Sequence, residues 1–332
     1  MPYPAKTLYA TGLLATNEGT YNGGGSVAAG TDGQRLAYDG PQGAPITYTE
    51  DYDGTRHDHL VGSNPPIPLT PSKTVCTGDL PGQVAGAGSA YSSGSVVPSH
   101  FPLLKASGLT FSLAAGTWTG IPTPFGTAPS SLVGGFYAAG ELWPFQAGFC
   151  QWKFAFQKGE PIVHTFGLTA LMGTPSDDVT VPQTITYPAI DPPKADGITF
   201  TIGGIALDVL SGEFALGWDD HSPRQVVTVA GAHAGWARGV RVKPRFKVTV
   251  ERTALATYDP YADRRNATGR TLLSTFGTSA TNRYKVNSAA SRAYLVSPVK
   301  PGNNGSVATW ELEFGLSATS LITNDAVSVL FD

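Results

Sequence analysis

The chain has 332 residues, which is enough for one large domain or for two ordinary domains that each bury a core. Charged residues make up only 14%, whereas 40 glycines and 26 prolines are a large share for a globular protein. Because both residues disfavour helices and are common in turns, the composition predicts a β-rich fold with many loops. The formal net charge is -3, and the most basic run, 238–247, alternates with apolar residues, which argues against a surface for nucleic-acid phosphates.

The cysteines and the N-terminus bear on the cellular compartment. Cys76 and Cys150 are too few for a disulfide scaffold and are not at metal-ligand spacing. The first residues lack the apolar core of a signal peptide, and no apolar run approaches the roughly 18 residues that a membrane span needs. We therefore expect a soluble protein made in a reducing cytoplasm, without membrane contact.

Residues 1–100 are rich in turn residues and poor in periodic patterns. The glycines at 23–25 are not followed by the Gly-Lys-Ser/Thr of a phosphate loop. A compact domain rarely carries so much irregular chain. We expect either long arms that become ordered against a partner or segments that are partly mobile, and residues 40–95 have no assigned role.

A short helix and a first regular strand are predicted after this region. Ser99 is placed to cap an apolar helix, and Gly108 is placed to end it. A strand follows from Leu109, and residues 134–145 lead toward the next feature.

The clearest pattern is a β-hairpin over residues 151–171. The aromatic residues of WKFAF at 152–156 alternate with polar or small residues, as in a half-buried strand. The letters KGEP predict a turn, and beyond it every second residue over 162–170 falls on one face. His164 lies on that apolar face, so we predict a hydrogen-bonded core histidine.

A proline-marked connection at 177–193 divides the chain into two predicted domains, 1–178 and 179–332. The first domain includes the N-terminal arm and a loop insertion at about 40–95. In the second domain a polar helix is predicted over 259–265 and is expected to continue through 271–277. The predicted strands of this half are 198–207, 213–218, 226–229, 245–251, one at Tyr284, 293–296 and 308–316.

The two halves share an order of parts that indicates a duplication. A Leu-Leu pair followed by a glycine precedes the Trp152 strand in the first half and the Trp310 strand in the second. The pairs are at 103–104 and 272–273, and the tryptophans lie 158 residues apart (310 minus 152), close to half the chain.

The candidate metal site is the run DYDGTRHDH at 51–59. Two histidines two positions apart on an extended segment share one face and could hold a transition metal. A site also needs further ligands held by surrounding groups, and this run is turn-rich, so a solvated loop is the competing interpretation. The possible ligands are Asp51, Asp53, His57, Asp58 and His59.

Two other groups of side chains suggest catalysis at first sight. The run DDHS at 219–222 combines carboxylate, imidazole and hydroxyl groups, but neighbours on one turn rarely converge as a triad does, so we interpret it as a β-turn before Pro223. Glu311 and Glu313 lie on the outer face of a predicted strand, within the spacing of a carboxylate pair. Without an aromatic cleft nearby, they are interpreted as subunit-contact or solvent residues. No catalytic, cofactor or metal residue is assigned, and no enzyme is predicted.

Several longer runs carry a family resemblance. They are HFPLLKASGL, GELWPFQAGFCQWKFAFQKGEPIVHTFGLTAL, RFKVTVE and TWELEFGL, and the opening YATGLLATNEGTY joins them, with Asn22 where the family usually has Gly. Together they resemble the major tail tube proteins of long-tailed bacteriophages, in the branch with two tube-type domains per chain. That family repeats a strand, a Gly-Glu turn and an apolar strand ending in Gly-Leu, as at Gly159-Glu160 and Gly167-Leu168 here. Residues 40–95 have no part in the resemblance.

The resemblance implies a mainly β fold of two β-sandwich or partial-barrel domains with short flanking helices. Copies would form a ring, a trimer with pseudo-sixfold symmetry or a hexamer, whose inner strands close into one continuous β-barrel. Rings would stack head-to-tail into the hollow tail tube, bridged by the N-terminal arm, and phage DNA would be ejected through it. A lumen with little positive charge would let DNA slide.

The implied partners are further copies of the chain, the tape-measure protein and DNA in the lumen without sequence specificity, and the tail terminator and distal tail proteins. The implied location is the virion tail, assembled in the host cytoplasm. The main alternative is a carbohydrate-binding β-sandwich module of the virion surface, with a groove lined by Trp118, Trp143 and Trp236. A hydrolase using the 219–222 run is a further alternative.

Overall fold

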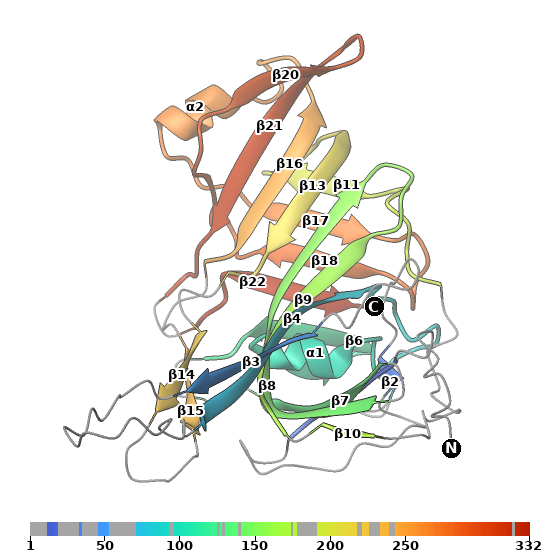
Figure 1. Ribbon diagram of the computed structural model, residues 1–332. Helices are drawn as coiled ribbons and strands as arrows, with labels where there is room; N and C mark the ends of the chain where they lie inside the picture. The colour runs from blue at the N-terminus through green and yellow to red at the C-terminus, as the bar shows by residue number, and fades with distance from the viewer. Residues whose placement is uncertain are drawn as a thin grey trace, which may run out of the picture.

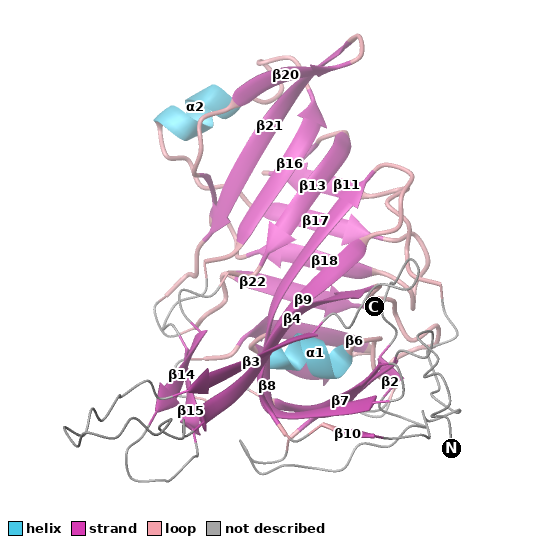
Figure 2. Cartoon of the chain, viewed as in Figure 1, coloured by secondary structure: helices cyan, strands magenta, loops and turns pink. Residues whose placement is uncertain are grey.

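The computed structural model describes residues 12–18, 33–34, 46–52, 71–92, 96–124, 127, 130–138, 141–173, 175–177, 191–217, 221–225, 233–238, 243–320 and 323–332. Strands dominate the regular structure, as the composition predicts (Figure 2). The strands are β1 (Gly12–Asn17), β2 (Gly33–Gln34), β3 (Ile46–Tyr52), β4 (Pro71–Gly82), β5 (Leu109–Ala114), β6 (Thr117–Pro122), β7 (Leu132–Ala138), β8 (Glu141–Gln157), β9 (Val163–Met172), β10 (Ser176–Asp177), β11 (Thr199–Ile202), β12 (Ile205–Ala206), β13 (Val209–Ala215), β14 (His221–Gln225), β15 (His233–Arg238), β16 (Arg245–Glu251), β17 (Leu272–Phe276), β18 (Tyr284–Ser288), β19 (Ala293–Leu295), β20 (Lys300–Asn304), β21 (Val307–Leu316) and β22 (Val327–Phe331), and the helices are α1 (Phe101–Ala106) and α2 (Pro260–Arg265).

The strands form two antiparallel sheets and one separate hairpin (Figure 1). The larger sheet has 13 strands; its main path runs β19-β21-β16-β13-β8-β7-β1-β2, and β9, β4 and β3 branch from β8. The smaller sheet has seven strands in the order β12-β11-β17-β18-β22-β6-β5, and β14 pairs with β15. Strands from both halves of the chain therefore lie in both sheets. Within the described residues of one chain, neither sheet closes into the barrel that the family resemblance implies.

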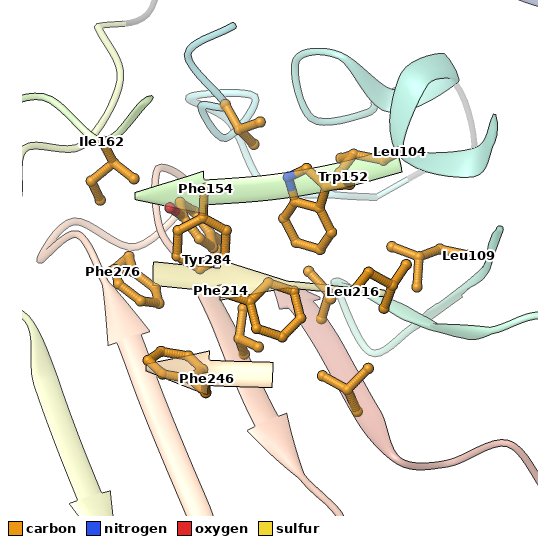
Figure 3. Close-up of a cluster of buried hydrophobic side chains, with 14 of the residues drawn as sticks. Leu104, Leu109, Trp152, Phe154, Ile162, Phe214, Leu216, Phe246, Phe276 and Tyr284 are labelled. Carbon is orange, nitrogen blue, oxygen red and sulfur yellow. The ribbon is translucent and has the colours of Figure 1, made fainter. Parts of the chain in front are cut away.

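The core lies between the two sheets and is built from alternate residues on neighbouring strands (Figure 3). Phe154, Phe214, Phe246 and Phe314 stand opposite one another across β8, β13, β16 and β21. Each of these four side chains is at most 1% exposed. From the smaller sheet, Phe276 meets Phe154 edge-on with ring centroids 5.2 Å apart. The predicted alternation of both aromatic strands is confirmed.

The helix α1 is present where it was predicted, but Ser99 does not cap it. The residue before the helix is His100, in a left-handed conformation with φ 57°, and its side chain makes no capping hydrogen bond. The Ser99 hydroxyl instead accepts a hydrogen bond from the backbone N–H of Ala85 at 2.6 Å. The helix ends at Ala106, and Gly108 follows it as the predicted terminating glycine, with a φ of 84° that suits a residue without a Cβ.

The helix α2 begins as predicted, with Pro260 in its first turn. The Asp259 carboxylate caps it by accepting a hydrogen bond from the Ala262 N–H at 3.0 Å. The predicted continuation through 271–277 is wrong, because Leu272–Phe276 is strand β17. Its burial alternates with period two, and it pairs on both sides with β11 and β18, so sheet pairing outweighs the helical pattern.

The first 100 residues contain more regular structure than the sequence predicts. β1 pairs with β7, β3 with β4, and β4 with β9, so part of the segment 40–95 belongs to the large sheet. Three features of the sequence analysis lie outside the described residues: the glycines at 23–25, the strand predicted at 226–229 and most of the connection at 177–193. The domain division at 178 stays a prediction. Neither described helix is long and apolar enough to cross a membrane.

Replacing Phe154 with Ala should lower the free energy of unfolding by about 3–5 kcal/mol, because it opens a cavity where rings from both sheets meet. Urea unfolding followed by tryptophan fluorescence measures this change. The matched control is Leu273→Ala, since Leu273 is 46% exposed and its truncation should cost no more than about 0.5 kcal/mol. Equal losses in the two variants would contradict a core centred on the Phe154 row.

Candidate assembly surface

The face of the large sheet that points away from the core carries charged side chains. Along β16 and β21 the buried apolar residues alternate with Arg245, Lys247, Glu311 and Glu313. Glu213 on β13 stands opposite Lys247 in the strand register. The predicted strand at 245–251, with one solvated face, is confirmed. The basic run 238–247 is not one strand, because Arg238 ends β15 and β16 begins at Arg245.

Cations on this face are neutralised by carboxylates on neighbouring strands. Arg245 lies 3.6 Å from Glu313, and Lys247 and Lys300 lie 3.3 Å and 3.2 Å from Glu311. The hydrogen bond from Lys300 lowers the pKa of the Glu311 carboxyl, and Lys247 acts in the same direction. Such half-exposed pairs each contribute about 0–1 kcal/mol to stability, so their main effect is on the charge of the surface.

Glu311 and Glu313 are therefore members of separate ion pairs. This arrangement agrees with the interpretation of the two residues as surface groups. A depression of about 370 Å³ lies beside Glu311 over β8, β13 and β16, where Ala155 and Ser211 are small. Its charged lining includes Glu213 and Lys247.

A buried polar chain lies beneath this face and joins the two sheets. The indole N–H of Trp152 donates a hydrogen bond to Nδ1 of His164 at 3.0 Å, and Nε2 of His164 lies 3.0 Å from the Tyr284 hydroxyl. Because Nδ1 accepts, the neutral imidazole carries its proton on Nε2 and donates it to the Tyr284 oxygen. None of these side chains is more than 1% exposed, and the prediction of a hydrogen-bonded core histidine is confirmed.

Burial controls the protonation of this chain. Desolvation holds the pKa of His164 well below its ordinary value, and the nearby His100 lowers it further. Burial likewise raises the pKa of the Tyr284 hydroxyl well above its ordinary value. Both groups are therefore uncharged in the folded protein at neutral pH.

The large sheet contains the same four-stranded unit twice (Figure 1). In the first unit the strands lie side by side as β3, β4, β9 and β8. In the second they lie as β13, β16, β21 and β20. When the strands of each unit are numbered along the chain, both units have the spatial order 1-2-4-3. In both units a helix and two strands of the smaller sheet lie, along the chain, between the second and the third strand.

This repeat corrects the residue correspondences expected from the sequence. The pair at 103–104 lies in α1, whereas the pair at 272–273 lies in β17. Trp152 is in the third strand of its unit, but Trp310 is in the fourth strand of the other. The two short matches thus fall on elements that are not equivalent, and the repeated topology appears only when strand neighbours are known.

The two units are joined edge to edge. β8, the last strand across the first unit, pairs with β13, the first strand across the second, and Phe154 stands opposite Phe214 at this junction. The outer strands of the joined units are β3 and β20. Among the described strands, β3 pairs only with β4, and β20 pairs only with β21.

The structure describes few of the predicted metal-ligand residues. Asp51 lies in β3, where the backbone alone is described, and Asp53, His57, Asp58 and His59 lie outside the described residues. In the part of the chain that is described, no three His, Cys, Asp or Glu side chains gather in a way that could hold a metal ion.

The run 219–222 is only partly described, and its interpretation as a turn is wrong for the described part. His221 and Ser222 begin strand β14, which pairs with β15. Pro223 is tolerated there because β14 has one strand neighbour among the described residues, and an edge strand can lack an N–H.

The three tryptophans expected to line a sugar groove do not share one setting. Trp118 is 8% exposed, and its indole N–H donates a hydrogen bond to the Val96 carbonyl at 2.9 Å, so it belongs to the core. Trp143 is half-buried on β8, and Trp236 lies in β15, where the structure describes the backbone only.

No protein-family model and no curated protein sequence matches the chain.

Replacing Tyr284 with Phe should lower the free energy of unfolding by about 1–3 kcal/mol, because the Nε2–H of His164 would lose its acceptor in a buried site. Urea unfolding at pH 7.5 measures the loss. Tyr261→Phe is the matched control, since Tyr261 is 39% exposed and loss of its hydroxyl should cost less than about 0.5 kcal/mol. A Tyr284→Phe protein as stable as this control would refute the buried hydrogen bond.

Stability should also fall as the pH drops below about 6.5, the ordinary pKa of histidine. Because the pKa of His164 is lowered in the folded protein, the unfolded chain binds the proton first as the pH falls. The contribution of His164 to the free energy of unfolding is therefore complete above about pH 6.5 and is lost in acid. The slope for one such group is at most about 1.4 kcal/mol per pH unit. Urea unfolding between pH 5 and 7.5 should show a smaller slope for His164→Gln, and identical slopes would contradict the assignment.

Proposed function

We propose that this chain is a structural subunit that self-associates into rings, which stack head-to-tail into the hollow tail tube of a long-tailed bacteriophage. DNA would be ejected into the host through the lumen. The observation that carries the proposal is the tandem unit of the large sheet, whose internal junction at β8 and β13 is an edge-to-edge strand pairing. A chain that already joins two like units in this way has the geometry to join the next copy similarly.

The number of units supports a particular ring. Each chain carries two four-stranded units, so a trimer would present six and imitate sixfold symmetry. A hexamer of chains is the other possibility. Closing the outer strands around a ring would produce the continuous barrel that one chain does not form by its described strands.

The charge of the polar face supports a role in passing DNA. Lys153 lies 4.0 Å from Asp79, and the cations on β16 and β20 are paired with Glu311 and Glu313. If this face lines the lumen, phosphates would meet neutralised cations and would not be retained. The tape-measure protein would occupy the same lumen during assembly, and the terminator and distal tail proteins would close its ends.

The proposal predicts that the purified protein forms hollow filaments as its concentration rises. Light scattering should detect the growth, and negative-stain microscopy should show tubes with an axial ring repeat. Discrete particles that remain monomeric at the highest attainable concentration would overturn the proposal. Discrete particles that also bind oligosaccharides would favour the carbohydrate-binding alternative.

A further inference from the structure

We infer that the outer edge of β20 in one copy pairs with the outer edge of β3 in the next copy. This inference deepens the proposed function and rests on it, since it names the strands through which the ring closes. It makes the contact between copies a repetition of the contact between the two units within a chain.

The first argument is topological. Inside the chain, the strand at the end of the first unit pairs with the strand at the start of the second, β8 with β13. The strand that ends the second unit is β20, and the strand that starts the first unit is β3. Joining β20 to the β3 of another copy continues the antiparallel order of the large sheet. The contact is heterologous, because one copy contributes its β20 edge and the next its β3 edge, as in a closed ring.

The second argument concerns the hydrogen-bonding groups at the β20 edge. The Ala308 carbonyl accepts a hydrogen bond from Arg252 N–H on the β16 side, so by alternation the backbone groups of Trp310 also point toward β16. Pro301 stands opposite Trp310 and Asn303 opposite Ala308, so both residues turn their backbone groups to the outer edge. Because Pro301 has no N–H, this edge is richer in acceptors than in donors.

The edge of β3 does not share this lack of a donor. Its seven residues, ITYTEDY, include no proline, so every residue that faces the outer edge presents both an N–H and a carbonyl. Two β20 edges facing each other would both lack the donor at Pro301, which disfavours a symmetric pairing of like edges. All five residues of β20 are exposed, so the edge is accessible in the free chain.

Disulfide cross-linking between copies that carry a cysteine at different positions tests the pairing. Full-length Asn303→Cys protein would be mixed with each variant of a short scan along β3, allowed to assemble and treated briefly with a mild oxidant. The native Cys76 and Cys150 are 1% and 0% exposed and should stay reduced, which mass spectrometry checks. The β3 variants are Thr47→Cys, Tyr48→Cys, Thr49→Cys and Glu50→Cys.

We expect a two-chain product from Asn303→Cys with at least one β3 variant, and none from Asn303→Cys alone. The matched control is Ser112→Cys, an exposed position on β5 at the edge of the smaller sheet, which should not cross-link to Asn303→Cys. Assembly by light scattering without any β20–β3 product, or cross-linking of Asn303→Cys to itself or to Ser112→Cys, would overturn the inference and leave the proposed function standing. Absence of assembly in the unmodified protein would overturn the proposed function as well.

Discussion

The row of phenylalanine rings across β8, β13, β16 and β21 is the contact on which the rest of the fold depends. It crosses from the first half of the chain to the second at Phe154 and Phe214, whose ring centroids are 5.2 Å apart. Rings of this size bury about 150–250 Å² each, so separating the halves would expose a large apolar surface to water. The two repeated units consequently behave as one sheet with one core, although each has the strand order of an independent unit.

The polar chain through His164 gives this core a fixed arrangement. Aromatic rings alone can repack with small losses, whereas a buried N–H without its acceptor is costly, so Trp152, His164 and Tyr284 favour one spacing of the two sheets. On the other side of the same strands, side chains are solvated and paired in charge. A single strand such as β8 thus serves as a wall of the core on one face and as part of a neutralised polar surface on the other, because successive side chains point in opposite directions.

Sequence patterns recover what is local in this fold and miss what is distant. The alternation around Trp152 and Phe314, the start of helix α2 at Pro260 and the core position of His164 could be predicted because neighbouring residues carry the signal. The partner of His164 in the other sheet could not, since Tyr284 lies 120 residues away. The alternation of ITYTEDY is a signal for β3, but the turn-rich residues around it outweigh that signal. The local pattern at 272–276 predicts a helix, because the pairing of this strand with β11 and β18 is not local. The sequence predicts a duplication with the wrong residue equivalences, because equivalent strands are identified by their neighbours in the sheet and not by matching residue types.

The outer strands of the large sheet leave backbone groups without a strand neighbour among the described residues. Both edges of β16 are occupied, by β13 and β21, whereas β20 pairs only with β21. At the β20 edge, Pro301 removes a donor that an unrelated strand would need, which protects a free chain from indiscriminate pairing. A strand without proline, such as β3, would leave one carbonyl opposite Pro301 without a donor, whereas a second β20 edge would lack two donors. If copies pair through β20 and β3 as proposed, Pro301 would act as a selector between partners. Assembly would then be specific without a large apolar interface, because the backbone groups would distinguish a β3 edge from a second β20 edge.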